Sequence, residues 1–207
     1  MRRWLWIITL LVALVAVGGA TASAAPEDAT GLTASEIAGL QYMREEEKLA
    51  RDVYLTLGEQ WALPVFKNIA RSEQSHMAAV KTLLDRYGVA DPALAERGRF
   101  QDPTLQALYD RLVSEGQASL AAALRVGVTI EELDIQDLKQ RLSQAPQADI
   151  KLVYTNLLRG SQNHLRAFTT TLARTAGETV QPQGGLQSDA NGVGLGARSR
   201  NGRGGWR

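Results

Sequence analysis

Apolar residues recur at three- and four-residue steps through four long stretches of the chain, a spacing that lines one face of an α-helix. The pattern predicts helices over residues 36–58, 65–87, 118–142 and 148–175. Gly127 and the β-branched residues after it weaken the third of these helices, and we expect a break there. No stretch alternates polar and apolar residues in the manner of a strand, so the predicted fold class is all-α.

The connections between these helices are short, long and short. Gly58 suits the end of the first helix, Pro64 the start of the second and Gly88 its end. The long connection that follows has a helix start at Asp102-Pro103 and predicts one short amphipathic helix. An antiparallel pair, a crossover that runs back along the bundle and a second antiparallel pair form the ferritin-like four-helix topology.

The two ends of the chain differ from the helical region. Residues 1–24 combine a charged start, about 14 apolar residues and a small-residue run, which predicts a cleaved signal peptide and export to the periplasm, the envelope or the exterior. An uncleaved membrane anchor is the alternative. Residues 25–35 are a predicted linker and residues 36–176 the bundle. Residues 177–207 are rich in glycine and arginine without apolar periodicity, which predicts a disordered tail.

The composition excludes several kinds of site. The chain has no cysteine, so disulfides, thiolate metal sites and iron–sulfur clusters are excluded. The predicted bundle is mildly acidic and lacks a basic helix face, so we expect no nucleic-acid binding. No nucleophile motif or phosphate-binding glycine loop occurs. Any chemistry therefore falls to carboxylates and to the 2 histidines.

Both histidines lie near the middle of predicted helices, level with several carboxylates. His76 follows Glu73 by three residues, so the two side chains share a helix face. The other candidates near helix midpoints are Glu47, Glu131, Asp134 and His164. Each of them alone is more typical of a solvated face or a packed core. Together they predict a layer of ligands across the bundle that binds two iron ions, or manganese ions. The charge of the ions would offset the cost of burying the carboxylates.

A family resemblance selects Glu47 from the run of three glutamates, where the helical wheel places Glu46 and Glu47 beside the apolar stripe and Glu45 away from it. The stretch EKLARDVY, residues 47–54, resembles the first metal-binding helix of the rubrerythrins. The matching features in the other three helices are IARSEQSH ending at His76, Gly127 with Glu131 and Asp134, and His164 with Phe168. Several stretches, including NIARSEQSH and GSQNHLRAF, are similar to a branch of secreted bacterial and archaeal ferritin-like proteins. This second resemblance implies no particular activity.

The resemblance implies a di-iron carboxylate protein with oxidase, peroxidase or ferroxidase chemistry on O₂ or peroxide. It implies that His76 and His164 each bind one ion, that Glu73 and Glu131 bridge the pair, and that Asp134 is a terminal ligand. Because the chain lacks a cysteine-based relay, electrons must come from an external donor. Bundles of this kind commonly pair, which implies a homodimer.

One position departs from the rubrerythrin pattern. Ser161 stands where the fourth helix normally carries a glutamate, so either Asp134 replaces that carboxylate or the second ion binds weakly. Behind the ligands, Tyr54 is expected to hydrogen-bond a carboxylate across the bundle, or else to be a packed core tyrosine. Two other functions stay open: a non-enzymatic metal-binding protein of the envelope, and an interaction bundle that binds no metal.

Overall fold

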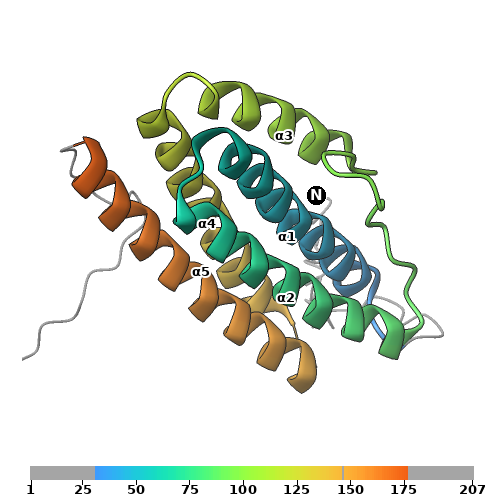
Figure 1. Ribbon diagram of the computed structural model, residues 1–207. Helices are drawn as coiled ribbons and strands as arrows, with labels where there is room; N and C mark the ends of the chain where they lie inside the picture. The colour runs from blue at the N-terminus through green and yellow to red at the C-terminus, as the bar shows by residue number, and fades with distance from the viewer. Residues whose placement is uncertain (1–30, 146, 177–207) are drawn as a thin grey trace, which may run out of the picture.

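The computed structural model describes residues 31–145 and 147–176 (Figure 1). The predicted signal segment and the predicted tail lie outside these residues, as does most of the predicted linker. The described part is all-helical, which confirms the fold class. Its helices are α1 Ala34–Trp61, α2 Pro64–Tyr87, α3 Pro103–Gly116, α4 Leu120–Gln144 and α5 Ala148–Ala176.

Four of the helices are long, and each of these packs against two of the other long helices. α1 lies most closely against α2, and α4 against α5, while α2–α5 and α1–α4 contacts complete the bundle. The predicted short helix is present as α3, which lies across α1 and α4 at the end of the crossover (Figure 1). The crossover therefore leads from the end of α2 along the bundle to the start of α4.

The ends of α1 and α2 show which local signals decide a boundary. Thr33 caps α1, and its side chain and that of Glu36 form a reciprocal capping box. Pro64 starts α2, and Gly88 ends it with a left-handed φ of 66°, so both predictions are confirmed. The prediction that Gly58 ends α1 is wrong, because the helix continues to Trp61. Gly58 instead allows close packing, since a Cβ there would lie 3.0 Å from Cβ of Phe66.

The expected break at Gly127 is also wrong, because α4 runs through this position without interruption. The ring of Phe168 on α5 fills the space that a side chain at 127 would occupy. A Cβ there would lie 2.6 Å from Cδ1 of Phe168. Glycine therefore serves the approach of α5 to α4, and the packing outweighs its low helix propensity.

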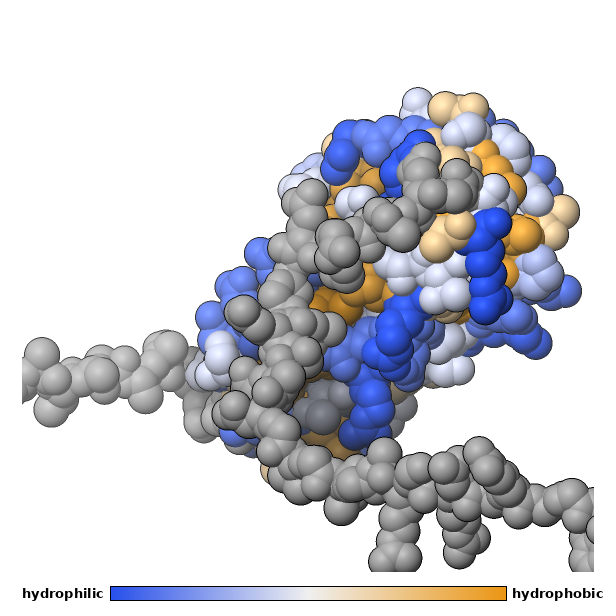
Figure 2. Space-filling view, turned by 90° about the vertical axis from the view of Figure 1, so that its left-hand side faces the viewer, coloured by the Kyte–Doolittle hydropathy of each residue, from blue (hydrophilic) through white to orange (hydrophobic). Residues whose placement is uncertain are grey.

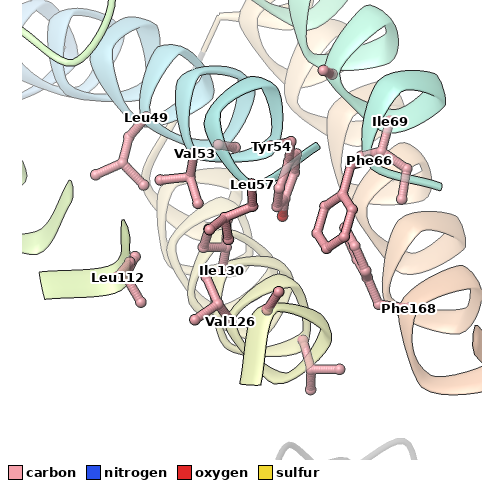
Figure 3. Packing of buried hydrophobic residues seen from close by; sticks show 14 of the residues in the cluster. Leu49, Val53, Tyr54, Leu57, Phe66, Ile69, Leu112, Val126, Ile130 and Phe168 are labelled. Atoms are coloured by element: carbon pink, nitrogen blue, oxygen red, sulfur yellow. The ribbon is translucent and has the colours of Figure 1, made fainter. Parts of the chain in front are cut away.

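Two clusters of buried apolar residues fill the bundle, one toward each end. The larger includes the rings of Tyr54, Phe66 and Phe168, which gather between α1, α2 and α5 (Figure 3). The centroids of Tyr54 and Phe168 lie 5.0 Å apart, and those of Phe66 and Phe168 lie 5.6 Å apart. The smaller cluster includes Leu40, Val80 and Tyr154. Polar side chains occupy the region between the two clusters.

One side of α1 fastens the crossover through buried charges. Lys48 is fully buried, forms an ion pair of 2.6 Å with Asp52, and donates to the carbonyl oxygens of Glu96 and Arg99. Asp52 also accepts a hydrogen bond of 2.9 Å from the Gly98 N–H. These contacts supply partners for crossover backbone groups that no helix or sheet satisfies.

Glu45 belongs to the same fastening, although the helical wheel places it away from the core. Its side chain is only 3% exposed, and its two oxygens accept hydrogen bonds from the backbone N–H groups of Gln101 and Asp102. The prediction that Glu45 faces away from the interior is therefore wrong. The crossover covers this side of α1 and buries its charged side chains. Apolar periodicity does not reveal this burial.

The face of the molecule in Figure 2 mixes residue types, with hydrophilic and hydrophobic residues interspersed. Within the described ranges, Leu94, Leu133 and Leu152 are the large hydrophobic side chains that are exposed. In these same ranges no helix combines the length and the apolar character needed to cross a membrane.

We predict that Lys48→Met destabilises the protein by about 3–5 kcal/mol. The carbonyl oxygens of Glu96 and Arg99 lose their charged donor, and buried Asp52 keeps only Arg51 as a cationic partner. The matched control is Lys81→Met, which removes an exposed pair with Asp85 and should cost less than about 1 kcal/mol. The measurement is the free energy of unfolding from urea titration. Equal losses in the two variants would contradict the fastening role of Lys48.

Candidate metal site

The six predicted ligands come together between the two apolar clusters, from all four long helices. Glu47 lies on α1, Glu73 and His76 on α2, Glu131 and Asp134 on α4, and His164 on α5. The four carboxylate residues are each at most 6% exposed, and the side chains of His76 and His164 are 12% and 10% exposed. The histidines are thus the part of this layer nearest to solvent.

Glu73 lies between the two imidazoles. Its Oε2 is 2.7 Å from Nδ1 of His76, and its Oε1 is 2.7 Å from Nδ1 of His164. The two rings stack at a centroid distance of 5.4 Å. Among the described residues, Glu73, His76 and His164 form the group whose ligand atoms are close enough together to hold a metal ion.

Each imidazole also meets a second carboxylate. Nδ1 of His76 lies 3.1 Å from Oε2 of Glu47, and Nδ1 of His164 lies 3.6 Å from Oε2 of Glu131. The other oxygen of Glu131 accepts a hydrogen bond of 2.6 Å from the Tyr54 hydroxyl. The expected hydrogen bond from Tyr54 across the bundle is therefore present.

Asp134 is held by the residue at which the chain departs from the rubrerythrin pattern. The Ser161 hydroxyl donates to Oδ2 of Asp134 and also contacts the carbonyl oxygen of Leu157 on the previous turn. The second oxygen of Asp134 is buried and has no hydrogen-bond partner. Ser161 therefore orients this carboxylate and leaves one of its oxygens free toward the layer.

Unpaired polar atoms concentrate in this region. Within residues 31–145 and 147–176, seven buried side-chain atoms lack a hydrogen-bond partner. Five of them belong to the layer or border it: Glu46 Oε2, Glu47 Oε1, Glu73 Oε1, Asp134 Oδ1 and His164 Nδ1. Such atoms normally find partners, and here most are acceptors. The donor set of carboxylate oxygens and imidazole nitrogens fits a divalent first-row transition metal.

The pKa values show how strongly these groups interact. Burial raises the pKa of Glu131 to about 8, and that of Asp134 to about 7 against the hydrogen bond from Ser161. Burial acts in the same direction on Glu73, but contacts with His164 and His76 outweigh it and lower its pKa to about 2. Burial lowers the pKa of the histidines, yet their carboxylate neighbours raise it to about 11 for His76 and about 9 for His164.

Two residues for which the sequence predicted no role contact the rings of the histidines. The Ser72 hydroxyl lies 2.9 Å from Nε2 of His164, on the side of the ring away from Glu73. Gly160 lies against the ring of His76, where a Cβ would be 2.6 Å from Nε2. The only signal for either was position: Ser72 precedes Glu73, and Gly160 lies one turn before His164.

A comparison with protein families gives a match that includes the described helices from residue 36 onward. The family described as an uncharacterized protein domain, DUF2202, matches residues 36–193. The chain belongs to this family. The residues matched by the DUF2202 model include all six candidate ligands of the layer.

A relative of this DUF2202 chain is known from an archaeon. The uncharacterized protein MJ0754 of Methanocaldococcus jannaschii is 50% identical over 153 residues, which cover 73% of this chain and 82% of the relative. The crystal structure of this hypothetical protein matches with a TM-score of 0.72 at 49% identity, covering 78% of this chain and 91% of the other. The helical fold is thus shared with a solved relative.

We predict that the metal-free protein loses stability as the pH rises from about 5 to about 9. The folded-state pKa values of Glu131, Asp134, His76 and His164 all lie above their ordinary values of 4.5, 3.8 and 6.5. Unfolding therefore releases protons across this range, and each proton lowers the unfolding free energy by about 1.4 kcal/mol per pH unit. The depressed pKa of Glu73 acts only below this range.

The measurement is urea unfolding of chelator-treated protein at several pH values. The double variant Glu131→Gln, Asp134→Asn removes two of the four groups and should flatten the profile. A stability that increases with pH over this range, or an unchanged slope in the variant, would refute the electrostatic account.

Proposed function

We propose that this protein is a ferritin-like bundle that binds two divalent transition-metal ions, with iron as the metal, and uses them in redox chemistry on O₂ or peroxide. The observation that carries the proposal is the position of Glu73, whose two oxygens each lie 2.7 Å from a different imidazole. A carboxylate shared in this way is suited to bridge two ions, each with its own histidine.

The distances support two equivalent ligand sets. One contains His76, Glu47 and an oxygen of Glu73, and the other contains His164, Glu131 and the second oxygen of Glu73. Although Oε1 of Glu73 and Nδ1 of His164 are close, neither has a hydrogen bond of normal geometry. When both act as acceptors, these two atoms are better suited to bind one cation between them than to form a hydrogen bond with each other.

The role of Glu131 differs from the one the rubrerythrin resemblance implies. Because Tyr54 occupies one oxygen of Glu131, this residue is better suited to bind one ion than to bridge. Asp134 has a free oxygen and feels the charges of Glu73 and both histidines. We therefore assign the second bridging role, which the resemblance gives to Glu131, to Asp134.

A pair of ferrous ions would supply the two electrons that convert peroxide to water. The protein's own groups hold and orient the site. Tyr54 and Ser161 fix two carboxylates, and the apolar clusters on both sides exclude water. With Nδ1 of His164 bound to an ion, Nε2 would carry the ring proton and donate a hydrogen bond to the Ser72 hydroxyl 2.9 Å away. Reduction of the oxidised site requires an external donor.

The remaining expectations belong to the same proposal. Four ionised carboxylates balance the charge of two divalent ions, so manganese fits the layer as well as iron. Work outside the cytoplasm and pairing into a homodimer are further expectations of the proposal.

One observation favours a second function, the binding of metal without catalysis. Glu47, Glu73 and Glu131 are each only 2% exposed, so a co-substrate has little access to the layer. A closed site of this kind suits storage or buffering of metal ions in the envelope. Peroxide consumption by the loaded protein separates the two functions.

We predict that the protein binds about two Fe²⁺ ions per chain after anaerobic loading, as the di-iron carboxylate sites of four-helix bundles do. The double variant His76→Ala, His164→Ala should bind none, because each ion loses its nitrogen ligand. The measurement is metal content by mass spectrometry after gel filtration. Peroxide consumption and ferric absorbance are then followed on the loaded protein.

The matched control is Asn163→Ala, which changes an exposed neighbour of His164 and should keep full metal content. One ion per chain would contradict the shared role of Glu73. Absence of metal from the wild-type protein would leave the interaction bundle as the remaining function. Full metal content without peroxide consumption would select the buffering role.

A further inference from the structure

A row of polar side chains continues from the layer along the seam between α1 and α4. Tyr54 contacts Glu131 at one end, and the Tyr42 hydroxyl donates to Oδ2 of Asp137 at 3.4 Å further along. The guanidinium of Arg141 then lies 4.6 Å from the centroid of the Tyr42 ring. As residue numbers fall along α1 they rise along α4, so the two helices are antiparallel and the row follows their common axis.

Glu46 lies within this row, between the layer and Asp137. It is 6% exposed, and its Oε2 is buried without a hydrogen-bond partner. Its carboxyl group interacts with the side chains of Asp134 and Asp137. Glu46 is therefore a buried carboxylate that faces one acid in the layer and a second acid outside it, and nothing else in the structure gives it a role.

The outer end of the row opens into a groove. The groove has a volume of about 530 Å³ and is lined by polar groups that include Tyr42, Glu45, Gln101, Asp102, Gln140 and Arg141. Asp137 is half-buried and joins the groove to Glu46 through Tyr42. Oxygen-bearing side chains thus lead from the groove to the layer.

The spacing of this row suits the stepwise transfer of a cation. Asp134 and Asp137 are one helical turn apart, which separates them by about 4.5 Å along the axis. Oxygen ligands hold divalent cations at about 2.0–2.6 Å. An ion can therefore exchange one carboxylate for the next without losing all of its oxygen contacts.

We propose that divalent cations enter the buried layer through the seam between α1 and α4, and that Asp137 and Glu46 pass them from the groove to Asp134. This inference rests on the proposed metal-binding function. Arg141 opposes entry, because it places a positive charge at the mouth. Among the contacts of the described residues, its guanidinium has no carboxylate ion pair to neutralise that charge.

The test follows the rate at which Co²⁺ enters the metal-free protein, measured by stopped-flow absorbance in the visible range at low ionic strength. Glu46→Gln should slow entry about tenfold or more with an unchanged final cobalt content, because an amide is a weaker ligand for a divalent cation than the carboxylate it replaces. Arg141→Gln should accelerate entry by about threefold or more. The control Glu115→Gln changes an exposed acid on α3 and should leave the rate within about twofold.

Circular dichroism verifies that each variant is folded, which is expected because each replaces a side chain by a glutamine of similar or smaller size. A wild-type rate in Glu46→Gln would overturn the route. A lower final cobalt content in that variant would make Glu46 a permanent ligand and would also overturn it. If the wild-type protein binds no cobalt, the metal layer itself fails, and this result is distinguished from the others by the absence of any final signal.

Discussion

The mutual repulsion of carboxylates inside the bundle is the constraint on which the rest of the structure depends. Glu47, Glu73, Glu131 and Asp134 share a small volume with little access to water, where like charges interact strongly. The two histidines relieve only part of this repulsion, which is why the carboxyl groups differ so widely in pKa. Bundle packing must hold these groups together against their electrostatic preference to separate.

The first helix meets this constraint while also holding the crossover. Glu47 faces the layer, Glu46 faces α4, and Glu45 binds the backbone of the crossover. Lys48 and Asp52, which form a buried ion pair, also bind the crossover. This run of charged residues resembles a solvated helix face, but its members face three different neighbours: the layer, α4 and the crossover.

The helices were predictable because apolar periodicity is local. The layer was predictable because its residues lie near helix midpoints, with a family resemblance to select Glu47. Apolar periodicity located the four long helices, and the interval from Glu73 to His76 located the centre of the layer. The functions of Gly58 and Gly127 were not predictable, because they depend on aromatic rings that approach from other helices. The burial of Glu45 and Lys48 was hidden for the same reason: their partners are backbone groups of an irregular segment, which has no sequence signature.

The division of α1 among three neighbours limits how the chain can change in length. Each residue turns a helix by about 100°, so inserting or deleting one residue within 44–52 would rotate one part of the run relative to the other. The layer and the crossover would then compete for the same side chains. Length variation among relatives should therefore collect outside this run, for example between Ala93 and Glu96. This stretch lies between the contact of Asp91 with Arg44 and that of Glu96 with Lys48, and it adds no turn to a helix.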